Sequence, residues 1–264
     1  MTHYFICLKG VVWREGLRFL HQRERFIAAL VRPLVWLLIF AAGFRFILGV
    51  SITPPYDTYI TYETYIVPGL VAMIQLFNGM QSSLSLVYDR EMGSMRLLLT
   101  SPLPRWYLLL CKLVAGATVS LFQVYAFLII AELVMVDLPA LSWLTILPVL
   151  VVSGLTLGAL GMLLSSRIRQ LENFAGIMNF VIFPMFFLSP ALYPLWRMRE
   201  SSELTYWICV LNPFTYVVEA IRHALYQQID GVAVLVVVMS AVVFFVLAVV
   251  GYDARKGMAQ RVTG

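Results

Sequence analysis

The sequence predicts an all-α, polytopic membrane protein with six transmembrane helices in a single domain, residues 1–264. Hydrophobic residues make up 61% of the chain and charged residues only 12%, about half the charged fraction of an average soluble domain. The mean hydropathy is +0.86. A soluble fold of this size could not bury so much apolar surface, so much of the chain is expected to face lipid.

Six segments contain the roughly 20 mainly apolar residues that cross a bilayer core. They are residues 33–50, 65–87, 107–134, 143–164, 174–195 and 232–252. Fifteen of the nineteen Lys and Arg residues precede the first segment, follow the last, or lie around the connections from second to third and from fourth to fifth. Because basic residues concentrate on the cytoplasmic side, both termini are expected to be cytoplasmic.

The first 30 residues predict an amphipathic helix ahead of the spans. On one helix over residues 5–29, Arg14, Arg18 and Arg25 share a face. The opposite face carries Phe5, Leu8, Val12 and Phe19. Such a helix lies along the cytoplasmic membrane surface, with its arginines toward lipid phosphate or cytosol. The alternative is an ordinary N-terminal arm.

The stretch 206–226 is apolar enough for a seventh span, but it contains Pro213, Glu219 and Arg222. Charges at the bilayer centre are costly, and a seventh span would also move the basic C-terminus outside. Residues 196–231 therefore predict short re-entrant or interfacial helices on the outer side. Asn212 would cap the second of them, with Pro213 in its first turn. Glu219 and Arg222 are spaced to pair on one helix face.

Polar residues within the spans are candidates for a translocation path. Gln75, Asn78 and Ser82 fall on one face of the second span, and they either line a conduit or bond neighbouring helices. Asn179 in the fifth span is a further candidate.

Two other patterns concern packing and the outer surface. The small residues Gly154, Gly158, Gly161 and Ser165 form a stripe in the fourth span that indicates close helix packing. Near the first outer loop the chain carries Tyr56, Tyr59, Tyr62 and Tyr65. They predict an aromatic belt at the membrane interface or a stacking surface for an emerging cargo.

Residues 88–105, between the second and third spans, alternate acidic and basic side chains and then give an apolar run that prolines end. This pattern predicts a small cytoplasmic helix with charged flanks for a soluble partner, the alternative being a solvated loop. The segment resembles the permease family of the type-2 ABC exporters. The matching residues are Glu91, Gly93, Leu97 to Leu99, Ser101, Pro102, Arg105 and Lys112.

The C-terminal half supports the same resemblance. Residues 183–195 look like the family's end of span five, and residues 211–222 look like its external re-entrant element. Pro190 stands where the family often has a glycine.

The resemblance implies a homodimer of permeases in the bacterial plasma (inner) membrane, each bound to one of two copies of an ABC ATP-binding subunit. An amphipathic or glycan-type substrate would move outward between the two protomers. The implied ATPase-coupling residues are Asp89, Arg90, Glu91, Gly93, Arg96, Leu98, Pro102 and Arg105. The N-terminal helix would touch the ATPase as well.

The chain itself shows no G-x-x-x-x-G-K-[ST] phosphate loop, so ATP and Mg are expected on the partner subunit, with no catalytic residue and no cofactor here. Its three cysteines and three histidines are scattered, without metal-ligand spacing. No basic, aromatic-laced module points to nucleic acid.

Three rival functions remain open. An ion-coupled secondary transporter would show inverted repeats and charges at mid-membrane, and an embedded enzyme would show clustered catalytic groups at one depth. Neither pattern is visible in the sequence. The third alternative is a membrane assembly factor that transports nothing. Only the resemblance of the cytoplasmic loop to the permease family argues against this alternative.

Overall fold

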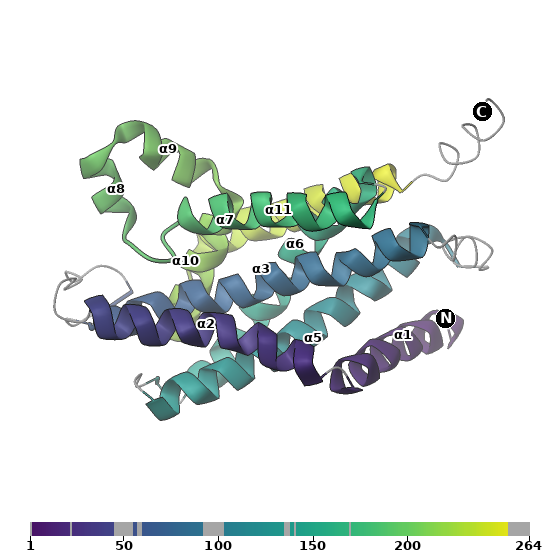
Figure 1. Ribbon diagram of the computed structural model, residues 1–264, viewed down its shortest axis with the longest axis horizontal. Coiled ribbons are helices and arrows are strands. Elements are labelled where there is room, and N and C mark those ends of the chain that lie inside the picture. Colours follow the sequence, from purple (N-terminus) through teal and green to yellow (C-terminus); the bar gives the residue numbers. More distant parts are fainter. Residues whose placement is uncertain are drawn as a thin grey trace.

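The computed structural model describes residues 2–21, 23–44, 55–56, 60–91, 103–134, 138–139, 141–168 and 170–252. The described helices are α1 (Thr2–His21), α2 (Arg23–Phe44), α3 (Tyr62–Glu91), α5 (Arg105–Val134), α6 (Ser142–Arg167), α7 (Leu171–Phe187), α8 (Leu195–Ser201), α9 (Glu203–Leu211), α10 (Pro213–Leu225) and α11 (Gly231–Gly251). The long helices form a bundle, and the short helices α8 and α9 project from one end of it (Figure 1).

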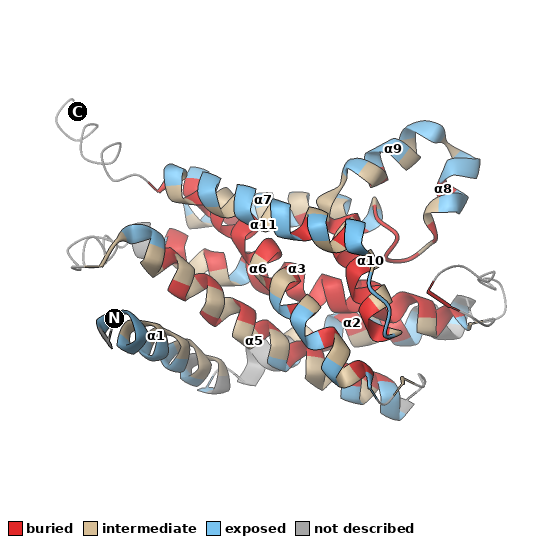
Figure 2. Cartoon of the chain, turned by 180° about the vertical axis from the view of Figure 1, so that it is seen from behind, coloured by how far each residue is buried: buried red, intermediate tan, exposed pale blue. Residues whose placement is uncertain are grey.

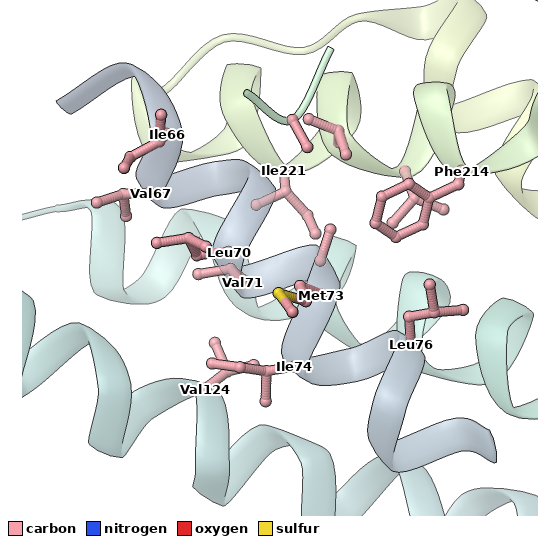
Figure 3. Packing of buried hydrophobic residues seen from close by; sticks show 14 of the residues in the cluster. Ile66, Val67, Leu70, Val71, Met73, Ile74, Leu76, Val124, Phe214 and Ile221 are labelled. Carbon is pink, nitrogen blue, oxygen red and sulfur yellow. The ribbon is translucent and has the colours of Figure 1, made fainter. Parts of the chain in front are cut away.

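Helix α3 occupies the centre of the bundle. Of the 18-residue apolar stretch of α3, 78% is buried inside the protein. The corresponding share in α11 is 17%, so α11 lies at the periphery. Helix α3 contacts α2, α5, α6, α7 and α10. Buried residues occur along most of its length (Figure 2). Figure 3 shows its side chains from Ile66 to Leu76 meeting Val124 of α5 and Phe214 and Ile221 of α10.

The backbones of α3 and α6 touch. A Cβ atom added to Gly79 would lie 2.8 Å from the backbone of Leu157 and Gly158, and one added to Gly161 would lie 2.6 Å from the Gly79 carbonyl oxygen. Glycine is therefore required at this crossing, since any side chain would push the helices apart. The small-residue stripe predicted for the fourth span is confirmed as a packing surface.

The two ends of the bundle differ. The N-terminus of α1 and the C-terminal ends of α3 and α11 lie together at one end, on the right in Figure 1. Helices α8 and α9 lie at the opposite end, on the left.

The predicted second, third, fourth and sixth spans are confirmed as helices long and apolar enough to cross a membrane. They cover Tyr62–Tyr88, Arg105–Leu133, Ser142–Arg167 and Gly231–Gly251. The predicted first and fifth spans correspond to the shorter apolar helices Ala29–Ile39 and Leu171–Phe187. Within the described residues the structure thus supports four spans, or five if α9 and α10 count as one broken span. Six stays a prediction.

Three predicted boundaries are corrected. The N-terminal helix ends at His21 and a second helix begins at Arg23, so Arg25 does not share a helix with Arg14 and Arg18. Pro33 lies inside α2 rather than at its start. The fifth span was expected to reach residue 195, but α7 ends at Phe187, because Pro190 and Pro194 cannot supply backbone N–H groups to continue it.

We expect Gly79→Ala to lower the stability of the purified protein by about 1–3 kcal/mol, the usual cost of overpacking. The added methyl would meet the α6 backbone, which cannot rotate away as a side chain can. Thermal unfolding in detergent measures the effect. Gly176→Ala on α7 is the matched control, because nothing lies within 4 Å of its added Cβ and alanine favours helix. An equal loss in both variants would contradict the assigned contact.

Candidate functional site

The short helix α10 is held at both ends by hydrogen bonds. At its N-terminus the Asn212 side chain accepts from Phe214 N, and its amide donates to the carbonyls of Met185 (2.8 Å) and Leu188 (2.7 Å). At its C-terminus the hydroxyl of Ser142 donates to Leu225 O at 2.6 Å. The predicted Asn212 cap, with Pro213 in the first turn, is confirmed. Helices α9 and α10 meet at a 77° bend, as expected for a broken span or a re-entrant pair.

Arg222 on α10 is buried, with 3% of its surface exposed. Its Nη1 donates to Glu219 Oε1 at 2.5 Å, which confirms the predicted pair. Its Nη2 donates to Pro190 O at 2.6 Å, and its Cζ lies 4.3 Å from the ring centroid of Tyr65. One carboxylate, one carbonyl and one aromatic face therefore compensate the charge, which is what a buried guanidinium needs.

Three tyrosines that the sequence predicts near the first outer loop pack inside the protein. Tyr65 OH donates to Pro190 O at 3.1 Å, and Tyr62 OH donates to Leu192 O at 2.9 Å. The Tyr56 ring lies edge-on to Tyr226, with 4.8 Å between centroids. The predicted aromatic belt or stacking surface is therefore wrong for Tyr56, Tyr62 and Tyr65, which are at most 4% exposed. Tyr59 lies outside the described residues.

The predicted polar face of α3 makes hydrogen bonds between and within helices. Gln75 Nε2 donates to Leu150 O at 2.7 Å and its Oε1 accepts from the hydroxyl of Ser153 at 2.6 Å. The amide of Asn78 donates to Gln123 Oε1 on α5. Ser82 bonds within α3, donating to Gly79 O at 3.0 Å. Gln75 and Asn78 thus bond neighbouring helices, and a role in a translocation path stays a prediction.

Asn179 lies apart from these residues. Asn179 is exposed on α7, and its exposed neighbours Phe180 and Phe183 are apolar. Within this chain its surroundings on the surface are therefore apolar. The structure therefore does not bring the four path candidates together.

Four of the expected ATPase-coupling residues belong to described helices, at the end of the bundle that also holds the N-terminus of α1 (Figure 1). Asp89, Arg90 and Glu91 form the last turn of α3, and Arg105 begins α5. Gly93, Arg96, Leu98 and Pro102 lie outside the described residues.

The N-terminal helix α1 packs along α5. The Tyr4 and Tyr107 rings lie edge to face, with 4.8 Å between centroids. Phe5, Ile6 and Trp13 are each more than 60% exposed, and Arg14 is exposed beside Glu15. Arg18 belongs to the same helix, whereas Arg25 begins the next one. The exposed apolar face of α1 fits a helix that lies on the membrane surface. Its location at the membrane interface stays a prediction.

Sequence reasoning missed the partners of these side chains. Gln123, Ser153 and Pro190 come from other helices or turns, and one sequence gives no signal of such pairing. In the sequence Arg32 is one of the basic residues that precede the first predicted span, but in the structure its Cζ lies 3.9 Å from the Phe77 ring centroid, beside the middle of α3. Among the described residues no three His, Cys, Asp or Glu side chains converge on a possible metal site.

A bundle of long apolar helices around one buried helix, closed at one end by a broken pair, defines a polytopic membrane protein. Residues 7–226 match the family model described as ABC-2 type transporter, and the chain belongs to this family. It is therefore a transmembrane subunit of an ABC transporter rather than its ATPase.

Relatives with assigned names agree with this class. A transport permease named ycf38 from Porphyra purpurea is 28% identical over 229 residues, covering 84% of this chain and 75% of that protein. Its counterpart from Pyropia yezoensis matches to the same extent. YbhR of Escherichia coli K12, named as a multidrug ABC transporter permease, is 31% identical over 172 residues, covering 63% of this chain and 45% of that protein.

We expect Glu219→Gln to destabilise the protein by roughly 3 kcal/mol, the lower end for a broken buried pair, because Arg222 keeps its bond to Pro190. Adding Arg222→Met should restore part of the loss, since no buried charge then remains. Thermal unfolding of both single variants and the double variant gives the coupling energy. Additivity within about 0.5 kcal/mol would show that the two side chains do not interact.

Proposed function

We propose that this chain is the permease of an ATP-driven exporter that acts as a homodimer in the bacterial plasma membrane. Two copies of a separate ATP-binding subunit would bind ATP and Mg and drive an amphipathic or glycan-type substrate outward. The family membership supports the ATP-driven class, and the name of the Escherichia coli relative supports an amphipathic cargo. Both termini would lie in the cytoplasm, with α8, α9 and α10 on the outer side.

One observation supports a substrate path between two protomers. The amide side chains of α3 inside the bundle bond neighbouring helices, Gln75 to Leu150 and Asn78 to Gln123. Asn179 instead lies exposed on apolar α7. An amide that faces hydrocarbon lacks a hydrogen-bond partner, so a second protomer or a hydrated path should cover it. Transport between two copies fits this arrangement better than transport through one.

The exposed aromatic residues of α7 suit an amphipathic cargo. Phe180 is 78% exposed, and Phe183 and Phe187 follow it one and two turns along the helix. Together with Asn179 they give a surface that is apolar with one amide, which can contact lipid chains or flat apolar groups while bonding a single polar group.

The ATPase would dock at the end of the bundle formed by α1, the last turn of α3 and the first turn of α5. This end carries the charged residues Asp89, Arg90, Glu91 and Arg105. Helix α3 also contacts α6, α7 and α10. A displacement at Glu91 can therefore reach the outer helices through one rigid element.

We expect a cysteine at Asn179 to crosslink two protomers through a short bis-maleimide. The experiment uses membranes and a background without the native cysteines, of which Cys111 and Cys209 are buried. Denaturing gels would show the dimer. Val242→Cys, on the exposed face of α11, is the control and should remain monomeric. Crosslinking at residue 242 but not at 179 would place the interface elsewhere and remove the support for a path at α7.

We expect Glu91→Lys and Gly93→Val to uncouple transport from ATP hydrolysis, because a docking element transmits motion only while it stays bound and rigid. Purified complexes in liposomes should lose export while the permease still assembles, and ATP turnover should no longer depend on the permease. Glu203→Lys, an equal charge reversal at the opposite end of the bundle, should leave coupling intact. Normal coupling in both test variants would place the ATPase contact on another element.

A further inference from the structure

A recess opens between α2, α3 and α5 beside Arg32. Its volume is about 80 Å³, and its polar lining residues are Arg32, Asn78, Gln81 and Gln123. The rest of the lining is apolar and includes Phe77 and Met73. Pockets for whole drug-sized ligands measure roughly 300–1,000 Å³, so this recess has room for one small polar group and not for a whole cargo molecule.

Arg32 lies well inside the length of the bundle. Phe77, which its guanidinium covers, is eleven residues before Tyr88 in the apolar part of α3. At 1.5 Å per residue this distance is about 16 Å along the helix axis. No carboxylate of the described residues lies within salt-bridge distance of Arg32. An arginine within the spans normally has an acidic partner or a ligand, because the bare charge is costly there.

The neutral groups of the recess add hydrogen-bond donors. Gln123 lines the recess and is only 4% exposed, and its Oε1 accepts from Asn78, which leaves its amide NH₂ as a hydrogen-bond donor with no partner among the described residues. Gln81 is exposed at the rim. A guanidinium fork and amide N–H groups, with no carboxylate among the lining residues, form a set that recognises an anion.

The outer face of α2 extends the recess with an apolar stripe. Val35 and Ile39 lie three and seven residues after Arg32, on the same helix face, and they are 43% and 62% exposed. Phe122, next to Gln123 on α5, is 64% exposed. An anionic group bound at Arg32 would thus have apolar surface beside it for a hydrocarbon chain.

We propose that this recess binds the phosphate group of a lipid, with Arg32 and Gln123 as ligands and the chain along Val35 and Ile39. The shared chemistry is a phosphate on a hydrocarbon chain, whether the lipid is a membrane phospholipid or a phosphorylated isoprenoid that is itself cargo. Arg32 supplies bidentate bonds to phosphate oxygens, and its contact with Phe77 holds the guanidinium plane in place. The proposal concerns binding by the permease alone and does not depend on ATP-driven export.

The test is lipid binding to the purified full-length permease by native mass spectrometry. The probes are phosphatidylglycerol, farnesyl phosphate, diacylglycerol as the uncharged control, and inorganic phosphate. The wild type should bind both lipid phosphates more tightly than diacylglycerol. Arg32→Gln should weaken them roughly 10- to 100-fold, as expected for lost charge-assisted hydrogen bonds. Arg32→Lys should be intermediate, since lysine keeps the charge without the fork.

Two further variants separate the site from general effects. Gln123→Glu keeps the shape and still accepts from Asn78, but its carboxylate would compete for Arg32 and should weaken lipid phosphate as strongly as Arg32→Gln. Arg197→Gln removes another arginine that stacks on an aromatic ring, Trp196, outside the recess, and should change nothing. Thermal unfolding confirms that each variant is folded.

The outcomes are distinct. Tighter binding of farnesyl phosphate would assign the site to cargo, and tighter binding of phosphatidylglycerol would assign it to a resident lipid, both within the proposal. Equal effects of Arg32→Gln and Arg197→Gln would overturn it, as would equal affinity for diacylglycerol. Displacement of the lipids by inorganic phosphate at the same concentration would also overturn it, because the chain would then contribute nothing. A lower dimer fraction in Arg32→Gln with unchanged lipid binding would show instead that a second copy covers the recess.

Discussion

The crossing of α3 and α6 is the contact on which the rest of the bundle depends. Gly79 and Gly161 let the two backbones touch, and no other residue type leaves room for that approach. Helices in lipid gain little from hydrophobic association with each other, so close packing and interhelical hydrogen bonds must hold them together. Close packing and an interhelical hydrogen bond occur together here, because Gln75, which donates to Leu150 O, lies one turn before Gly79 on α3.

Once α3 is packed against α6, α10 and the turn after α7 have defined positions. Ser142 and Thr145, in the first turn of α6, donate to the last carbonyls of α10 at 2.6 and 2.9 Å. Tyr62 and Tyr65, in the first turn of α3, donate to the turn that follows α7. Helix α10 and the turn that follows α7 are therefore anchored to the same two helices that form the central crossing. A shift of α3 along its axis would move both attachments together.

The sequence predicts much of the fold, because length and hydropathy alone locate the long helices. The predicted segment 143–164 and α6 differ by one residue at the start and three at the end. Local rules also predict the Asn212 cap and the pairing of Glu219 with Arg222, since each involves residues within three positions. Long-range partners cannot be predicted in this way. Tyr65 and Pro190 are 125 positions apart, and nothing local distinguishes a tyrosine of an interfacial belt from one that donates to a buried carbonyl.

The same limit separates two arginines that look alike in the sequence. Arg222 is enclosed by Glu219, Pro190 and Tyr65, so its charge is compensated inside the chain and its role is to hold α10 in place. Arg32 has an aromatic face on one side and amide groups around it, but no described carboxylate near it. A guanidinium inside a membrane span is costly without a counter-charge, and no described carboxylate supplies one to Arg32, so the proposed lipid phosphate would compensate it. The packing partners, rather than the residue type, therefore distinguish the arginine that holds α10 in place from the arginine beside the recess, for which we propose a phosphate ligand.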